Sequence, residues 1–174
     1  MTQAAADLAI VGFVSAAAWW DVRSHRIPNQ LTIAGLIVAL MLRALLGVDA
    51  FLHGLGGVGI TLLASLVLYG LRAIGGGDVK LLAGIGAFLG STQIVGALGL
   101  MAVLGAAFAL ASVIRRGVLP LLIFNTLDLV RSWRSLGLAG ERRKLESPAA
   151  LTIPYGVPIA VGTLIWWFGK GIRL

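Results

Sequence analysis

The sequence contains no cysteine and few charges: only 12% of its residues are Asp, Glu, Lys or Arg, and only seven are acidic. The absence of cysteine excludes disulfides, thiolate metal sites and a cysteine nucleophile. Soluble domains carry about 25% charged residues, so the composition excludes an ordinary soluble domain. The zinc-protease motif His-Glu-x-x-His is missing too. We expect neither a metal nor a cofactor.

Apolar residues dominate instead: 59% of the chain is hydrophobic, and the mean hydropathy is +0.97. These values predict an all-α, polytopic membrane bundle surrounded by lipid. A chain of 174 residues has room for roughly six spans of about 20 residues. We therefore predict a single integral-membrane domain over residues 1–174. The net charge of +7 follows the predicted topology, so we expect no nucleic-acid partner.

Six apolar segments are predicted to be membrane helices: residues 4–20, 31–46, 54–73, 79–89, 94–114 and 151–168. No Lys or Arg precedes the first segment, so we interpret it as an uncleaved helix. Asn29 or Ser24 is expected to cap the second segment, and Arg43 near its end to snorkel. Residues 48–53 are expected to form a loop. Residues 117–150 mix apolar and basic residues, which predicts a cytoplasmic amphipathic helix on the membrane surface.

Basic residues predict the orientation of these helices. Eleven of the fourteen Lys and Arg residues fall on one predicted side: Arg23, Arg26, Arg72, Lys80, Arg115, Arg116, Arg131, Arg134, Arg142, Arg143 and Lys144. The positive-inside rule places this side in the cytoplasm and the N-terminus outside. His25 and His53 then lie on opposite sides, so we expect no shared metal site. Trp166 and Trp167 are expected to form an interfacial aromatic anchor.

Asp21 and Asp78 each sit next to the end of an apolar run, at the same predicted depth and on the same predicted side. Acidic residues are costly there, so two of them suggest a paired-carboxylate active site such as that of an intramembrane aspartyl protease. In such a pair, one ionised carboxylate takes a proton from water, and one protonated carboxyl group polarises the scissile carbonyl. Taken singly, Asp21 is equally well explained as a loop residue paired with Arg23 or Arg26.

Asp78, taken singly, is equally well explained as the N-cap of the fourth helix. Three glycines before it, Gly75, Gly76 and Gly77, weaken that explanation. Glycines permit positive φ and let another backbone come close, which a protease needs in order to hold an extended peptide. Asp7 lacks such a setting, and we interpret it as an ordinary boundary residue.

Three motifs carry a specific resemblance. They are Asp21 followed by Arg26-Ile27-Pro28-Asn29-x-Leu31-Thr32, Gly75-x-Gly77-Asp78-x-Lys80, and Ile153-Pro154-Tyr155-Gly156 with Pro158, Ala160 and Gly162. In this order, and embedded in six apolar segments, they resemble the motifs of type IV prepilin peptidases. The short chain is most similar to the small form that serves tight-adherence (Flp-type) pili.

The resemblance implies that the protein cuts the leader peptide of a prepilin at the cytoplasmic face of the bacterial inner membrane, typically after a glycine. It implies that Asp21 and Asp78 are the catalytic pair. Larger members of the family carry an N-terminal cysteine-rich segment and methylate the new pilin N-terminus. Because this chain has no cysteine, we expect no such segment and no methylation.

Further residues are expected to shape the cleft. Gly75, Gly76 and Gly77 would line it, and Lys80 would contact a headgroup or the substrate backbone. Pro154, Tyr155 and Gly156 would either break the last helix near the same depth or simply start it. The remaining glycines, Gly84, Gly86, Gly96 and Gly99 among them, are expected at close helix contacts.

Two alternative functions fit the composition. One is a presenilin-like or signal-peptide-peptidase-like protease with a substrate other than a pilin. The other is a small transporter in which the two aspartates form a proton or cation site. Transporters often contain inverted repeats, and the sequence has no convincing internal repeat. The oligomeric state is not predicted.

Overall fold

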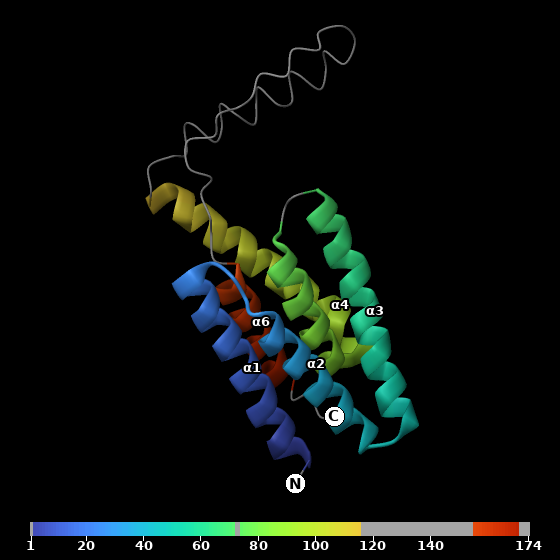
Figure 1. The fold of residues 1–174 in the computed structure, drawn as a ribbon. Helices are drawn as coiled ribbons and strands as arrows, with labels where there is room; N and C mark the ends of the chain where they lie inside the picture. The colour runs from blue at the N-terminus through green and yellow to red at the C-terminus, as the bar shows by residue number, and fades with distance from the viewer. Residues whose placement is uncertain (1, 72–73, 116–154, 171–174) are drawn as a thin grey trace, which may run out of the picture. The chain divides into compact units, whose positions relative to one another are not determined.

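The computed structural model describes residues 2–71, 74–115 and 155–170, and every regular element in them is a helix. The elements are α1 (Thr2–Ser24), α2 (Asn29–Ala44), α3 (Val48–Gly70), α4 (Gly76–Arg115) and α6 (Gly156–Gly169) (Figure 1). The described residues up to Ala106, together with residues 155–170, belong to one compact unit, and the end of α4 from Ala107 belongs to another. All the contacts discussed below lie within the first unit.

The helices confirm the predicted apolar segments in place and type, with one difference. Residues 48–53, predicted as a loop, form the first turns of α3. The segments predicted at 79–89 and 94–114 share the label α4, but a kink at Gly90, which has the non-helical angles φ 73° and ψ 172°, separates them into two helices as predicted. The predicted amphipathic helix at 117–150 lies outside the described residues.

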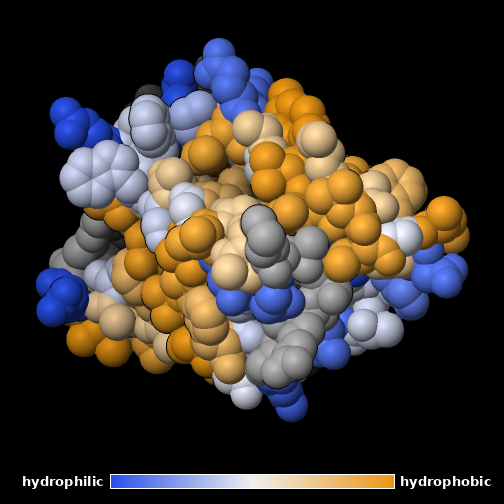
Figure 2. Space-filling model, turned by 90° about the horizontal axis from the view of Figure 1, so that it is seen from below, coloured by the Kyte–Doolittle hydropathy of each residue, from blue (hydrophilic) through white to orange (hydrophobic). Residues whose placement is uncertain are grey.

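Three of the helices, α1, α3 and α4, are long and apolar enough to cross a membrane. Large apolar side chains such as Leu8 and Leu63 are exposed, whereas several polar side chains are buried. Figure 2 shows apolar side chains over much of the face that it presents. This arrangement suits helices that face lipid rather than water, so the chain is a membrane protein. The predicted number of six spanning helices stays a prediction.

An aromatic cluster joins three helices in the interior. The ring of Phe88 on α4 lies 6.1 Å from that of Phe13 on α1 and 6.4 Å from that of Trp167 on α6. A Cβ added at Gly84 would approach the Phe13 ring to 2.7 Å, so glycine makes room for that ring. Trp167 is only 1% exposed, and its Nε1 donates a 2.8 Å hydrogen bond to Asp7 Oδ1.

These contacts correct two predictions. Trp167 is a core residue rather than an interfacial anchor, because the apolar cluster encloses its ring and Asp7 accepts its N–H. Asp7 is correspondingly not an ordinary boundary residue, since it joins α1 to α6. Of the four glycines predicted at close contacts, Gly84, Gly86 and Gly96 are confirmed. The prediction for Gly99 is wrong, because nothing lies within 4 Å of a Cβ added there.

Arg43 is buried rather than snorkelling, with 6% of its surface exposed. Its Nε donates to Ala87 O at 2.6 Å, and its Nη2 donates to Phe88 O at 2.8 Å. Its Nη1 donates to Ala50 O at 3.2 Å. Ala87 and Phe88 belong to the last turn of α4 before Gly90, where helical hydrogen bonding is interrupted. The guanidinium group therefore donates hydrogen bonds to backbone carbonyl groups that the break in α4 leaves free. These bonds explain why the side chain is buried instead of extending to water.

Candidate active site

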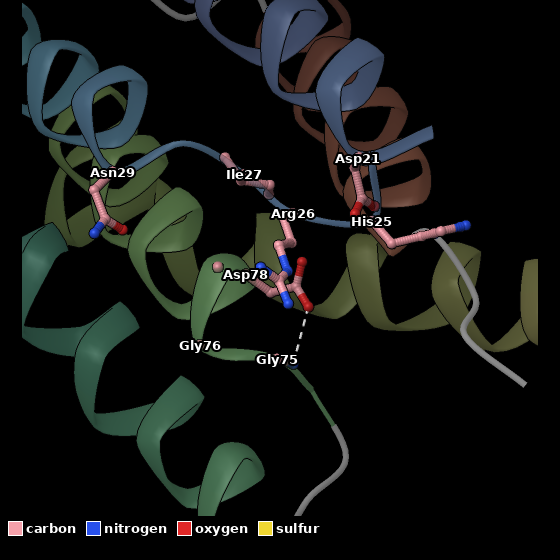
Figure 3. A pocket seen from close by; sticks show the side chains of 9 residues that line it. Asp21, His25, Arg26, Ile27, Asn29, Gly75, Gly76 and Asp78 are labelled. Carbon is pink, nitrogen blue, oxygen red and sulfur yellow. Dashed lines mark hydrogen bonds between the residues drawn. The ribbon is translucent and has the colours of Figure 1, made fainter. Parts of the chain in front are cut away.

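A cavity of about 330 Å³ lies where α1 ends and α2 and α4 begin (Figure 3). Its lining residues come from two short stretches of the chain: Asp21, His25, Arg26, Ile27 and Asn29, and Gly75, Gly76, Gly77 and Asp78. The structure thus brings together the two aspartates that were singled out in the sequence.

Asp21 lies in the last turn of α1 and is 7% exposed. Its Oδ2 accepts a 2.7 Å hydrogen bond from the backbone N–H of Gly156, the first residue of α6. The first N–H groups of a helix have no partner within the helix, so they are free to bind a carboxylate. This bond holds the carboxyl group of Asp21 and fixes the start of α6 beside it.

Asp78 is the third residue of α4 and is 8% exposed. Its Oδ2 accepts a 3.0 Å hydrogen bond from the N–H of Gly75, and the Gly75 carbonyl accepts the N–H groups of Asp78 and Val79. Gly75 is therefore the N-cap residue, and Asp78 reaches back to it as the third residue of a capping box does. Asp78 is thus not itself the N-cap, although it does stabilise the start of the helix.

The second oxygen of each carboxyl group has no hydrogen-bond partner in the part of the chain that the structure describes. Among the described residues, Oδ1 of Asp21 and Oδ1 of Asp78 accept no hydrogen bond. A carboxylate has room for several hydrogen bonds on its two oxygens. Each aspartate is therefore held by one oxygen and presents the other for a water molecule or a substrate.

The glycines before Asp78 line the cavity, but not for the expected reason. Among the described residues, the glycines with positive φ are Gly47 and Gly90, so Gly75, Gly76 and Gly77 do not use that freedom. Gly76 and Gly77 instead form the first turn of α4 and have helical geometry. A Cβ added at Gly77 would lie 3.5 Å from Ile27 Cβ, which is ordinary contact. The absence of side chains leaves the space of the cavity open.

Two other predicted site residues contact residues that line the cavity. Lys80 donates a 2.7 Å hydrogen bond from Nζ to Oδ1 of Asn29. Gly156 contacts Asp21, and α6 begins there with Tyr155 as its N-cap. Pro154 lies outside the described residues.

Four lining residues were not predicted as part of the site: His25, Arg26, Ile27 and Asn29. Arg26, Ile27 and Asn29 stand in the motif that follows Asp21, which was the sequence signal for them. The structure places them through a turn at His25, whose N–H donates to Asp21 O at 2.8 Å. His25 has φ 50°, a left-handed angle that is uncommon outside glycine. It redirects the chain, so that the residues after it pass along the cavity to reach α2.

Neither predicted cap of α2 is observed. The N-cap is Pro28, which makes no side-chain cap bond, while Asn29 accepts from Lys80. Ser24 donates from Oγ to Trp20 O. Within the described part of the chain, no group of three His, Asp or Glu residues is arranged to hold a metal ion.

Comparison with known proteins gives a match to a protein family. Neither the curated proteins nor the solved structures contain a match to this chain. The model of the type IV leader peptidase family matches residues 8–110, which include both aspartates and every residue that lines the cavity. The match covers more than half of the chain, and it agrees with a membrane protein that has a cavity lined by two acidic residues. The chain therefore belongs to the type IV leader peptidase family.

Proposed function

We propose that this leader peptidase is an intramembrane aspartyl endopeptidase that removes the leader peptide of a type IV, Flp-like prepilin. One observation carries the proposal: Asp21 and Asp78, remote in sequence, are both buried and line one cavity. Two close carboxyl groups that share one proton are the machinery of aspartic proteases. Family membership supplies the leader peptide as the class of substrate.

The reaction needs a water molecule between the two carboxyl groups. The ionised aspartate takes a proton from this water as its oxygen attacks the scissile carbonyl carbon. The protonated aspartate gives its proton to the carbonyl oxygen, which forms a tetrahedral intermediate. Collapse of the intermediate breaks the C–N bond: one aspartate gives the proton that it took from water to the leaving nitrogen, and the other takes a proton back from a hydroxyl group of the intermediate, which becomes the new carboxyl group. The two carboxyl groups again share one proton, so no metal is required.

The charge distribution supports an active site that faces the cytoplasm of the bacterial inner membrane. Arg26 lines the cavity, while Arg23 lies in the last turn of α1 next to Asp21. Lys80 binds Asn29 at its edge. Basic residues collect on the cytoplasmic side of membrane proteins. The prepilin leader would then be cut before the hydrophobic helix of the pilin leaves the membrane.

The test is leader cleavage by purified protein in detergent, measured as the shortening of a prepilin. Asp21→Asn and Asp78→Asn are each expected to lower cleavage at least 1000-fold while the protein still accumulates in membranes. Asp49→Asn is the matched control, because Asp49 is an exposed aspartate in the first turn of α3. Full activity in either active-site variant removes that aspartate from the mechanism. Loss of activity with a chelator, restored by a metal, contradicts the metal-free reaction.

A further inference from the structure

A second, mostly apolar groove lies beside the aspartate cavity. It is lined by Asn29, Thr32, Ile33 and Leu36 of α2, Val58 and Leu62 of α3, and Lys80 and Ala83 of α4. On α2 these positions recur every three or four residues, so they form a single face of the helix. The face extends from Asn29 to Leu36 of α2, seven steps of 1.5 Å or roughly 10 Å. A short apolar stretch of chain fits this length.

The groove and the aspartate cavity adjoin at one residue. Asn29 lines both, and its Oδ1 accepts the Nζ of Lys80, which lines only the groove. The polar end of the groove is thus the end next to the aspartates, and the apolar walls lead away from it along α2. A chain that passes between the two carboxyl groups and leaves past Asn29 enters the groove directly.

We infer that the groove is the docking surface for the hydrophobic segment of the substrate, on the C-terminal side of the scissile bond. This inference rests on the proposed function. The apolar walls suit the hydrophobic segment, because its side chains contact apolar surface in the groove as they do in lipid. The chain between the scissile bond and that segment is extended, so its backbone N–H and C=O groups need partners. The Asn29 amide and the Lys80 ammonium group supply hydrogen-bonding groups at that point.

Ile33 and Ile37 provide a matched pair for the test. Both lie on α2, and they are 55% and 51% exposed, but only Ile33 lines the groove. Each is replaced by Trp, and each variant is assayed on two substrates. One is a full prepilin with its hydrophobic segment, and the other is a soluble leader peptide that ends shortly after the scissile bond.

Ile33→Trp is expected to raise the KM of the full prepilin about tenfold, with the effect confined to that substrate. Ile37→Trp is expected to change neither substrate's kinetics. An equal loss on both substrates assigns the effect to damage at the aspartates and overturns the inference. No effect on either substrate means that lipid fills the groove, which overturns it as well. Failure of the unsubstituted protein to cleave either substrate defeats the proposed function instead.

Cross-linking gives a readout that does not depend on KM. The chain has no cysteine, so Ile33→Cys introduces a single thiol into the groove. An Asp78→Asn background keeps the substrate uncut, and the prepilin carries one cysteine in its hydrophobic segment. A disulfide is expected with Ile33→Cys and not with Ile37→Cys. Equal cross-linking of the two variants places the segment outside the groove and overturns the inference.

Discussion

Asp21 and Gly156, 135 residues apart in sequence, are joined by a buried 2.7 Å hydrogen bond from the glycine N–H to Oδ2 of the aspartate. A Cβ added at Gly156 would lie 2.8 Å from that oxygen and 2.9 Å from Asp21 Cβ. Real Cβ atoms do not approach so closely, and the side chain of aspartate is too short to move aside. The start of α6 and the position of Asp21 therefore depend on each other.

Gly156→Ala is expected to lower leader cleavage at least tenfold, because the added methyl group displaces either Asp21 or α6. Cleavage by purified protein measures this effect, and thermal unfolding should show a loss of about 1–3 kcal/mol. Gly169→Ala is the control on the same helix, since nothing lies within 4 Å of a Cβ added there. Equal activity of the two variants would show that the contact with Asp21 does not position the carboxyl group.

The turn after α1 gives a second prediction. His25 has φ 50°, and a left-handed angle costs a residue other than glycine about 1–2 kcal/mol. His25→Gly is therefore expected to unfold at the same temperature or higher. His25→Val is expected to unfold earlier, because a β-branched residue suits this angle poorly. The Val variant should also cleave more slowly, since Arg26 and Asn29 reach the cavity through this turn. A thermal melt in detergent compares the two, and a Val variant as stable as the Gly variant contradicts the account.

The aspartate pair, the helical segments and the approximate helix ends could be predicted from the sequence, because each is encoded locally. Runs of apolar residues mark the helices, and a carboxylate at the end of such a run is costly enough to be informative. The Asp21–Gly156 bond could not be predicted, because its partner lies on a remote helix. The burial of Arg43 was missed for the same reason: its acceptors, Ala87 and Phe88, become available only because α4 breaks at Gly90.

Arg43 carries a third prediction, which concerns stability. Arg43→Met keeps the apolar stem but removes the donors to Ala87, Phe88 and Ala50. Buried carbonyls left without donors cost about 1–3 kcal/mol each, so the midpoint of thermal unfolding should fall clearly. The unfolding midpoint of Arg43→Lys should lie between those of Arg43→Met and the unsubstituted protein, because one ammonium group replaces the planar fork of the guanidinium group. Arg23→Met is the control, since Arg23 is exposed. A midpoint in Arg43→Met equal to that of the control refutes the role of Arg43 at the helix break.

The fourth prediction separates close-packed glycines from spare ones on α4. A Cβ added at Gly86 would lie 2.5 Å from Gly57 O and 2.6 Å from Thr61 Oγ1, so α3 and α4 approach each other closely at this point. Gly86→Ala should push these helices apart, lower stability by about 1–3 kcal/mol and slow leader cleavage, because α4 carries Asp78. Gly99 lies in α4 beyond the break at Gly90, with nothing within 4 Å of an added Cβ.

Gly99→Ala should therefore leave cleavage unchanged and raise stability by up to about 1 kcal/mol, because alanine favours a helix more than glycine does. Thermal unfolding and cleavage of the same purified preparations measure both effects. The two substitutions add the same methyl group on either side of the break at Gly90 in α4, so a difference between them is assigned to the surroundings of each glycine. Equal losses of stability and of leader cleavage in both variants would mean that α4 tolerates an added methyl group at neither position. The close contact with α3 would then not account for the effect of Gly86→Ala.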